Sequence, residues 1–147
     1  MHKKEERDFE LFIVDTLVAI FKVKSYTTEF KNGHDLQHNS LHWDATMRAF
    51  EIIGESLNYL LGDEKFENLS PSYFQKIVNF RNVIAHGYFG IDAEEVWDII
   101  TQKLEDLNKD LLRVANAQFD IKEALASTIK EYSPRDEKIT RYLQTLL

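Results

Sequence analysis

Residues 41–61, with the sequence LHWDATMRAFEIIGESLNYLL, decide the fold class. In this stretch, apolar or small side chains recur at alternating spacings of four and three residues, at Trp43, Met47, Phe50, Gly54, Leu57 and Leu61. Because an α-helix completes a turn in about 3.6 residues, this rhythm places all six positions on one face. The stretch therefore predicts a long helix that packs along a seam in a helical bundle.

The rest of the chain predicts further helices and little else. The 147 residues include only 5 Gly and 2 Pro, too few for the many tight turns of a β-sandwich or a barrel. The polar segment 24–37 contains Gly33 and is predicted to be a connection. Apolar stripes and capping signals predict helices over about Phe9–Val23, from Ser70-Pro71 to Tyr88, from Asp92 to Ala115, from Asp120 to Tyr132, and from Ser133-Pro134 to Leu147. We therefore expect an all-α fold.

The length suits a single domain with an addition at its end. A chain of 147 residues is too short for two ordinary domains. The last two predicted helices look like a helical hairpin appended to the bundle. We expect residues 1–117 to form the bundle and residues 118–147 to form a C-terminal extension that packs on the same domain.

Composition excludes several kinds of chemistry. The chain has 0 Cys, which excludes a disulfide framework, a thiol nucleophile and Cys-ligated metal, and which fits a reducing compartment. It shows neither an apolar signal core nor a membrane-length apolar run, so we expect a soluble, cytoplasmic protein without membrane partners. The net charge is −7, with both signs interspersed, so any nucleic-acid site must be local.

Arg81 stands at an unexpected position on its predicted helix. Phe74, Arg81 and Tyr88 are seven residues apart, so successive members differ in azimuth by only about 20°. A guanidinium in an apolar stripe is costly unless it is paired or faces a wet interface. Either Glu55 pairs with Arg81 in the same chain, or two copies of the chain pack these helices together and build a composite cleft.

The residue types near Arg81 suit work on a phosphodiester. A histidine such as His86 can take a proton from a ribose 2′-hydroxyl or give one to the leaving 5′-oxygen near neutral pH. An arginine offers a bidentate fork to phosphate, and the Tyr88 hydroxyl can bond the substrate. The structural alternative is an Arg81–Glu55 pair that locks the bundle, a His86 that caps the helix end, and a Tyr88 in the core.

Three other histidines are spaced as metal ligands can be. His34, His38 and His42 are four residues apart and would share a face of one helix. Asn39-Ser40 resembles a helix cap, however, which would divide the three between a loop and a helix start. We therefore favour solvated or capping histidines, and we expect no metal ligand and no other cofactor. Trp43 and Trp97 lie on helical stripes and are expected in the core.

Three blocks of the sequence resemble a known family. Residues 81–88, RNVIAHGY, match the R-x4-H-x-Y signature of HepT-like HEPN proteins. Residues 89–92 (FGID) and 96–97 (VW) resemble the family's link into the following helix, and residues 48–55 (RAFEIIGE) are similar to its Gly-Glu segment. The resemblance covers roughly Phe9 to Val114.

This resemblance implies an up-down HEPN helical bundle that dimerises through the motif helix and acts as a metal-independent endoribonuclease toxin. Such proteins are usually encoded beside an MntA-type minimal nucleotidyltransferase antitoxin, which transfers AMP to the motif tyrosine. Carried over by position, Arg81 and His86 are the catalytic pair at a dimer-interface cleft, and Tyr88 is the AMPylation site. The expected partners are a second copy, the antitoxin and RNA, but not DNA.

Roles of the remaining site residues stay open. Asn82 and Tyr88 are candidates for substrate contact, although Asn82 could instead bond only the turn. Glu55 is a candidate support for Arg81, more plausible as its salt partner than as a base. Two other functional classes remain, namely a non-catalytic nucleotide- or partner-binding module that is paired with a nucleotidyltransferase, and a purely structural helical dimer.

Overall fold

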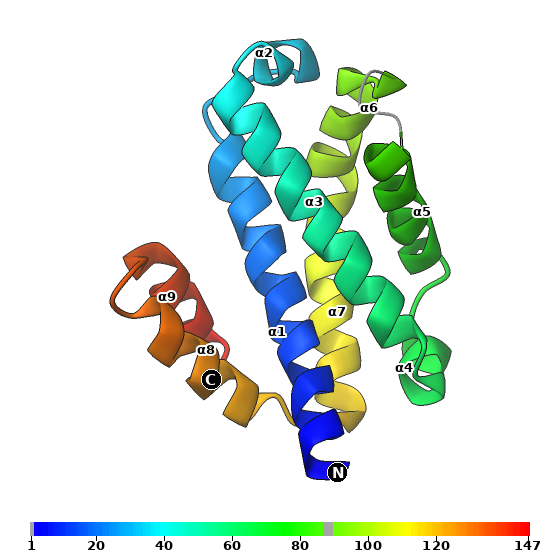
Figure 1. The fold of residues 1–147 in the computed structure, drawn as a ribbon, viewed down its shortest axis with the longest axis vertical. Coiled ribbons are helices and arrows are strands. Elements are labelled where there is room, and N and C mark those ends of the chain that lie inside the picture. Colours follow the sequence, from blue (N-terminus) through cyan, green and yellow to red (C-terminus); the bar gives the residue numbers. More distant parts are fainter. Residues whose placement is uncertain (1, 87–89) are drawn as a thin grey trace.

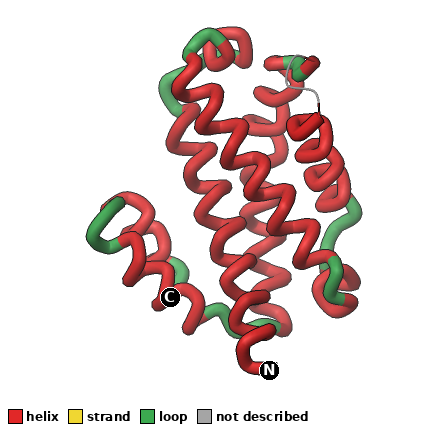
Figure 2. Tube along the Cα trace, in the orientation of Figure 1, coloured by secondary structure: helices red, strands yellow, loops and turns green. Residues whose placement is uncertain are grey.

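The computed structural model describes residues 2–86 and 90–147, and every regular element in these ranges is a helix (Figure 2). Four long helices run alternately up and down beside one another (Figure 1). They are α1 (His2–Thr27), α3 (Ser40–Leu61), α5 (Tyr73–His86) and α7 (Leu104–Gln118). The prediction of an all-α, up-down bundle is confirmed.

The core lies between α1 and α3, the helix from which the fold class was predicted. Met47, Ile53 and Leu57 of α3 are fully buried, as are Ile13 and Leu17 of α1. The second apolar flank of α1 is covered too, because α7 and α8 (Lys122–Tyr132) also pack on this helix. The predicted seam of α3 thus lies in the core of the bundle, and α1 has neighbours on several sides.

The segment 24–37 was predicted to be a connection, but parts of it are helical. The helix α1 continues to Thr27, and α2 (Gly33–Gln37) forms after a turn. The Asn32 side chain caps α2 by accepting a bond from the Asp35 N–H at 2.8 Å. Gly33 lies so close to α6 (Ala93–Asp98) that an added Cβ would stand 2.1 Å from the Ala93 carbonyl oxygen. Contact with a segment distant in sequence therefore stabilises this short helix.

A second short helix, α4 (Glu64–Leu69), was not predicted and changes the role of Ser70. Its Phe66 side chain is fully buried. The predicted N-cap at Ser70 is wrong, because the Ser70 hydroxyl donates to the Phe66 carbonyl at 2.6 Å and so ends α4. The helix α5 begins at Tyr73, two residues after Pro71.

The helix predicted from Asp92 to Ala115 exists, with an irregularity inside it. The Asp92 carboxylate accepts from the Glu94 N–H at 2.9 Å, which confirms the predicted cap. The path then runs through α6, a π-helical segment (Ile99–Lys103) and α7. A π-helical turn widens the helix locally and re-aims the side chains around it.

The last two helices form a hairpin against the bundle (Figure 1). They are α8 and α9 (Glu137–Thr145). Tyr142 fixes α9, because its ring stacks on Phe21 at 4.7 Å and its hydroxyl donates to Asn108 at 3.1 Å. The predicted start of the last helix at Ser133-Pro134 is wrong, since Asp136 caps α9 through the Ile139 N–H.

Helices long and apolar enough to cross a membrane are absent from the described part of the chain.

Candidate functional site

Arg81 lies on the face of α5 that packs against α3. Phe74, seven residues earlier, is fully buried, and Arg81 is half-buried, so the predicted shared azimuth is confirmed for these two. The helices meet at Gly54, where an added Cβ would lie 2.1 Å from the Arg81 Cβ. Gly54 thus makes room for the arginine, a role beyond its place in the predicted seam.

Glu55, the next residue of α3, meets the guanidinium. The Arg81 Nη2 lies 3.3 Å from the Glu55 Oε1, and the two side chains are 34% and 46% exposed. The predicted intrachain pair is therefore confirmed. A second copy of the chain is therefore not needed to meet this arginine.

The guanidinium is held at the boundary between core and solvent. Arg81 Nη1 donates to the Asn82 Oδ1 at 3.1 Å. Its Nε atom is buried and has no hydrogen-bond partner among the described residues. The stem is thus fixed between the helices while the outer nitrogens reach the surface. An anion such as phosphate can compete with the exposed Glu55 carboxylate for these nitrogens.

The remaining motif residues lie at the end of α5 or beyond it. His86 is the last residue of α5, five positions after Arg81, which places its Cα about 140° around a regular helix. Its side chain is not among those that the structure describes, and Tyr88 lies outside the described residues. The predicted roles of His86 and Tyr88 therefore stay predictions. So does substrate contact by Asn82, whose exposed side chain accepts from Arg81.

An exposed apolar side chain of α5 and a groove beside it lie near the motif. Val83, between Arg81 and His86, is 52% exposed. Together with Phe80 it borders a groove of about 400 Å³ whose opposite wall includes Ile99 and Lys103 of the π-helical segment. Irregular π turns are frequent at functional sites, so this wall of the groove is a candidate functional surface.

A polar tie between α5 and α7 escaped the sequence reasoning. The Tyr73 hydroxyl donates to the Asp110 carboxylate at 2.5 Å. Partial burial and this bond raise the pKa of Tyr73 above its usual range. The sequence does not reveal this bond, because Asp110 lies 37 residues after Tyr73.

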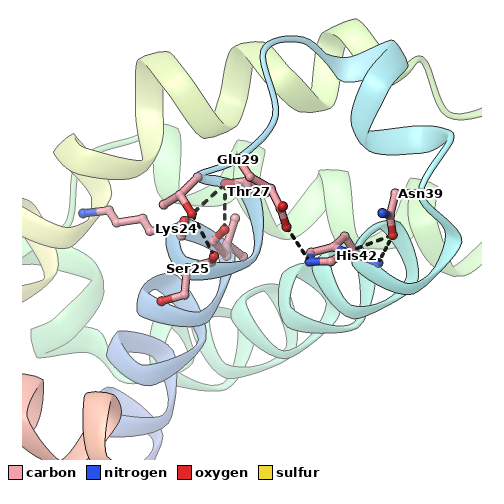
Figure 3. Close-up of polar contacts among 8 residues, drawn as sticks. Lys24, Ser25, Thr27, Glu29, Asn39 and His42 are labelled. Atoms are coloured by element: carbon pink, nitrogen blue, oxygen red, sulfur yellow. Dashed lines mark hydrogen bonds and ion pairs between the residues drawn. The ribbon is translucent and has the colours of Figure 1, made fainter.

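The three spaced histidines are held by other partners, as Figure 3 shows for His42. The His42 Nε2 lies 2.9 Å from the Glu29 carboxylate, and Asn39 caps α3 through the His42 N–H at 3.1 Å. His34 lies in α2, and His38 is its C-cap. Among the side chains that the structure describes, which do not include those of residues 1–7 and 85–89, no three from His, Cys, Asp or Glu are grouped so that they could hold a metal ion.

The structure thus combines an up-down helical bundle with an ion pair between Arg81 of α5 and Glu55 of α3. The family described as "Ribonuclease HepT-like" matches residues 16–114, and the chain belongs to this HepT-like family.

Relatives in archaea carry related names. A protein named "Putative RNase MJ1380" from Methanocaldococcus jannaschii is 31% identical over 108 residues, which are 72% of this chain and 95% of that protein. A second protein of that organism, "Putative RNase MJ0125", is 22% identical over 111 residues, or 74% of this chain and 92% of that protein. A third, "Putative RNase MJ0127", is 27% identical over 107 residues, or 72% and 86%. No solved structure matches the chain significantly.

Proposed function

We propose that the chain is the toxin ribonuclease of a HepT–MntA type toxin–antitoxin pair and cuts RNA without a metal ion. The observation that carries this proposal is the Arg81 guanidinium, which Gly54 and Glu55 hold at the surface of the motif helix. Family membership and the names of the relatives support it. The bundle of residues 1–117 would carry the site, and residues 118–147 would pack on it.

The chemistry needs one cation and two proton transfers. Arg81 exchanges Glu55 for the scissile phosphate and stabilises the charge that builds on its nonbridging oxygens. A neutral His86 accepts the proton of the 2′-hydroxyl as that oxygen attacks phosphorus. A protonated His86 then gives a proton to the 5′-oxygen as the bond from phosphorus to that oxygen breaks. The products would be a 2′,3′-cyclic phosphate and a 5′-hydroxyl.

A homodimer through α5 would supply both histidines. The exposed Val83 and the open groove beside it support such an interface, because burial of this apolar side chain against a second copy would be favourable.

Regulation would act at Tyr88, two residues after His86. Transfer of AMP from ATP to its hydroxyl, with loss of pyrophosphate, would add a negative charge and a bulky base beside the catalytic pair. In the alternative function, the same surface only binds a nucleotide or docks the transferase. The exposed ion pair is compatible with this alternative too.

Cleavage of a short single-stranded RNA by the purified chain, with EDTA present, tests the proposal. Arg81→Lys should lower kcat/KM by about 100-fold or more, because lysine keeps the charge but not the planar fork. His86→Ala should abolish cleavage, whereas Arg48→Lys, which alters an exposed arginine paired with Glu51, should leave it unchanged. Full activity of His86→Ala would contradict the catalytic role of His86, and a wild-type chain that does not cleave RNA would leave the binding module.

A further inference from the structure

A pocket of about 320 Å³ lies where the C-terminal hairpin meets the bundle. Its walls include Phe12 and Lys22 of α1, Ile52 and Glu55 of α3, and Tyr132 at the end of α8. Glu55 is also the partner of Arg81 at 3.3 Å. The pocket therefore borders the candidate site through a shared carboxylate.

The hairpin wall of this pocket is an addition to the family fold. The family match ends at residue 114, before α8 begins at Lys122. Tyr132 thus belongs to a part of the chain that the family match does not include, yet it shares a pocket with a residue of the RAFEIIGE block. The added hairpin consequently reaches toward the site.

Lys22 holds the Tyr132 ring in place. The lysine Nζ donates to the Tyr132 hydroxyl at 3.2 Å and lies 5.4 Å from the centroid of the ring. Both residues are half-buried, so each keeps a face toward the pocket. A lysine ammonium has three donors, which leaves donors for an anion beside the ring.

The pocket offers the two chemistries that bind an unpaired nucleotide. Phe12, Val18 and Ile52 supply apolar contact, and the Tyr132 ring supplies a flat stacking partner. Lys22 supplies a cation for a phosphate, in a lining that also includes the Asp15 and Glu55 carboxylates. The volume lies at the small end of the range for ligand pockets, which suits one nucleotide. The charged Lys22 side chain distinguishes this pocket from a purely apolar docking groove.

We propose that this pocket is a subsite for one unpaired nucleotide of the RNA substrate, flanking the bond cut at Arg81. The base stacks on Tyr132, and a backbone phosphate meets the Lys22 ammonium. The inference rests on the proposed ribonuclease function, and it assigns the hairpin a role in holding single-stranded RNA.

Two measurements on the full chain test the subsite. The first is the Kd for a fluorescent 2′-O-methyl oligoribonucleotide, which has no 2′-hydroxyl and is not cleaved. The second is the cleavage rate of the unmodified RNA at saturation. Tyr132→Leu, which keeps an apolar side chain under the hairpin, should weaken binding about 10-fold, since a stacked aromatic ring contributes roughly 5- to 100-fold per base. The saturated rate should stay within about twofold of the wild type.

Charge and ring have separate controls. Lys22→Ala should weaken binding and lower the slope of log Kd against log salt by about 1, because one phosphate contact is lost. Lys130→Ala, which removes an exposed lysine of α8 outside the pocket, should change neither. Tyr132→Phe keeps the ring and should bind within about twofold of the wild type.

Unchanged binding by Tyr132→Leu, or an unchanged salt slope in Lys22→Ala, would overturn the subsite while the wild-type chain still cleaves RNA. A wild-type chain that neither binds nor cleaves RNA would overturn the proposed function, and the subsite with it. Melting curves of each variant confirm that the hairpin stays folded, and circular dichroism of the bundle serves as the second check.

Discussion

At the scale of single residues, the site depends on a close approach between two helices. Arg81 packs where α3 has no side chain, and its Nη2 atom then meets Glu55. The sequence gives Gly54 a place in the seam and offers Glu55 as one of two partners for Arg81. It does not show that Gly54 and Arg81 touch, because 26 residues lie between them and only the folded chain brings them together.

Gly54→Ala tests this close approach. The added methyl would stand 2.1 Å from the Arg81 Cβ and 2.6 Å from its Cγ, so α5 must move. We expect this clash to lower the free energy of unfolding by about 1–3 kcal/mol. The loss is larger than the gain of about 1 kcal/mol from the higher helix propensity of alanine. Chemical denaturation measures it. Gly90→Ala, where nothing lies within 4 Å of the added Cβ, is the control, and an equal effect in both variants would contradict this explanation.

At the scale of elements, long periodic helices could be predicted and short ones could not. The seam of α3 and the stripe of α1 repeat over many turns, so their pattern is visible without tertiary context. The helix α2 has 5 residues and α4 has 6, too short for any period to repeat. Both helix starts that were predicted at serine-proline pairs are wrong. Ser70 ends a helix, and the last helix is capped by Asp136 and not by Ser133.

Docking of the hairpin element on α1 should depend on pH through Asp15. Partial desolvation, and then the nearby Glu131 carboxylate, raise the pKa of the Asp15 carboxyl, and Lys22 opposes them. A raised pKa means that the folded state holds this proton more tightly than the unfolded state. The stabilisation is therefore full below the unfolded pKa, about 4, and is lost as the pH rises through the folded value.

Asp15→Asn should consequently raise the Tm at pH 7 and lose this advantage below about pH 4, where the wild-type carboxyl is protonated. Thermal melts across this range measure the difference. Asp8→Asn, which changes an exposed carboxylate on the same helix, is the control. An Asp15→Asn Tm that is lower than that of the wild type at pH 7 would show that its charged form is stabilising.

At the scale of the whole molecule, the bundle and its family could be predicted from the R-x4-H-x-Y block and the helical periods, and both are confirmed. Assembly and activity remain proposals. The Arg81 charge that suggested a dimer is met within one chain, so the proposed dimer now depends on the surface of α5 around the exposed Val83.

Val83→Glu tests that surface. A charge at this 52% exposed position would have to be buried in the proposed interface, so the variant should sediment as a monomer at micromolar concentration and lose cleavage. Leu41→Glu changes a side chain that is 77% exposed at the start of α3 and should leave the dimer intact. A wild-type chain that is already monomeric, or a dimeric Val83→Glu, would remove α5 as the interface.

The ends of the cleaved RNA test the central claim most directly. Mass spectrometry of an oligoribonucleotide incubated with the chain in EDTA should find a 2′,3′-cyclic phosphate on one fragment and a 5′-hydroxyl on the other, because a histidine moves protons while the 2′-oxygen attacks. Both products should vanish in His86→Ala. Fragments with 3′-hydroxyl and 5′-phosphate ends, or intact RNA until a divalent cation is added, would contradict metal-independent catalysis by Arg81 and His86.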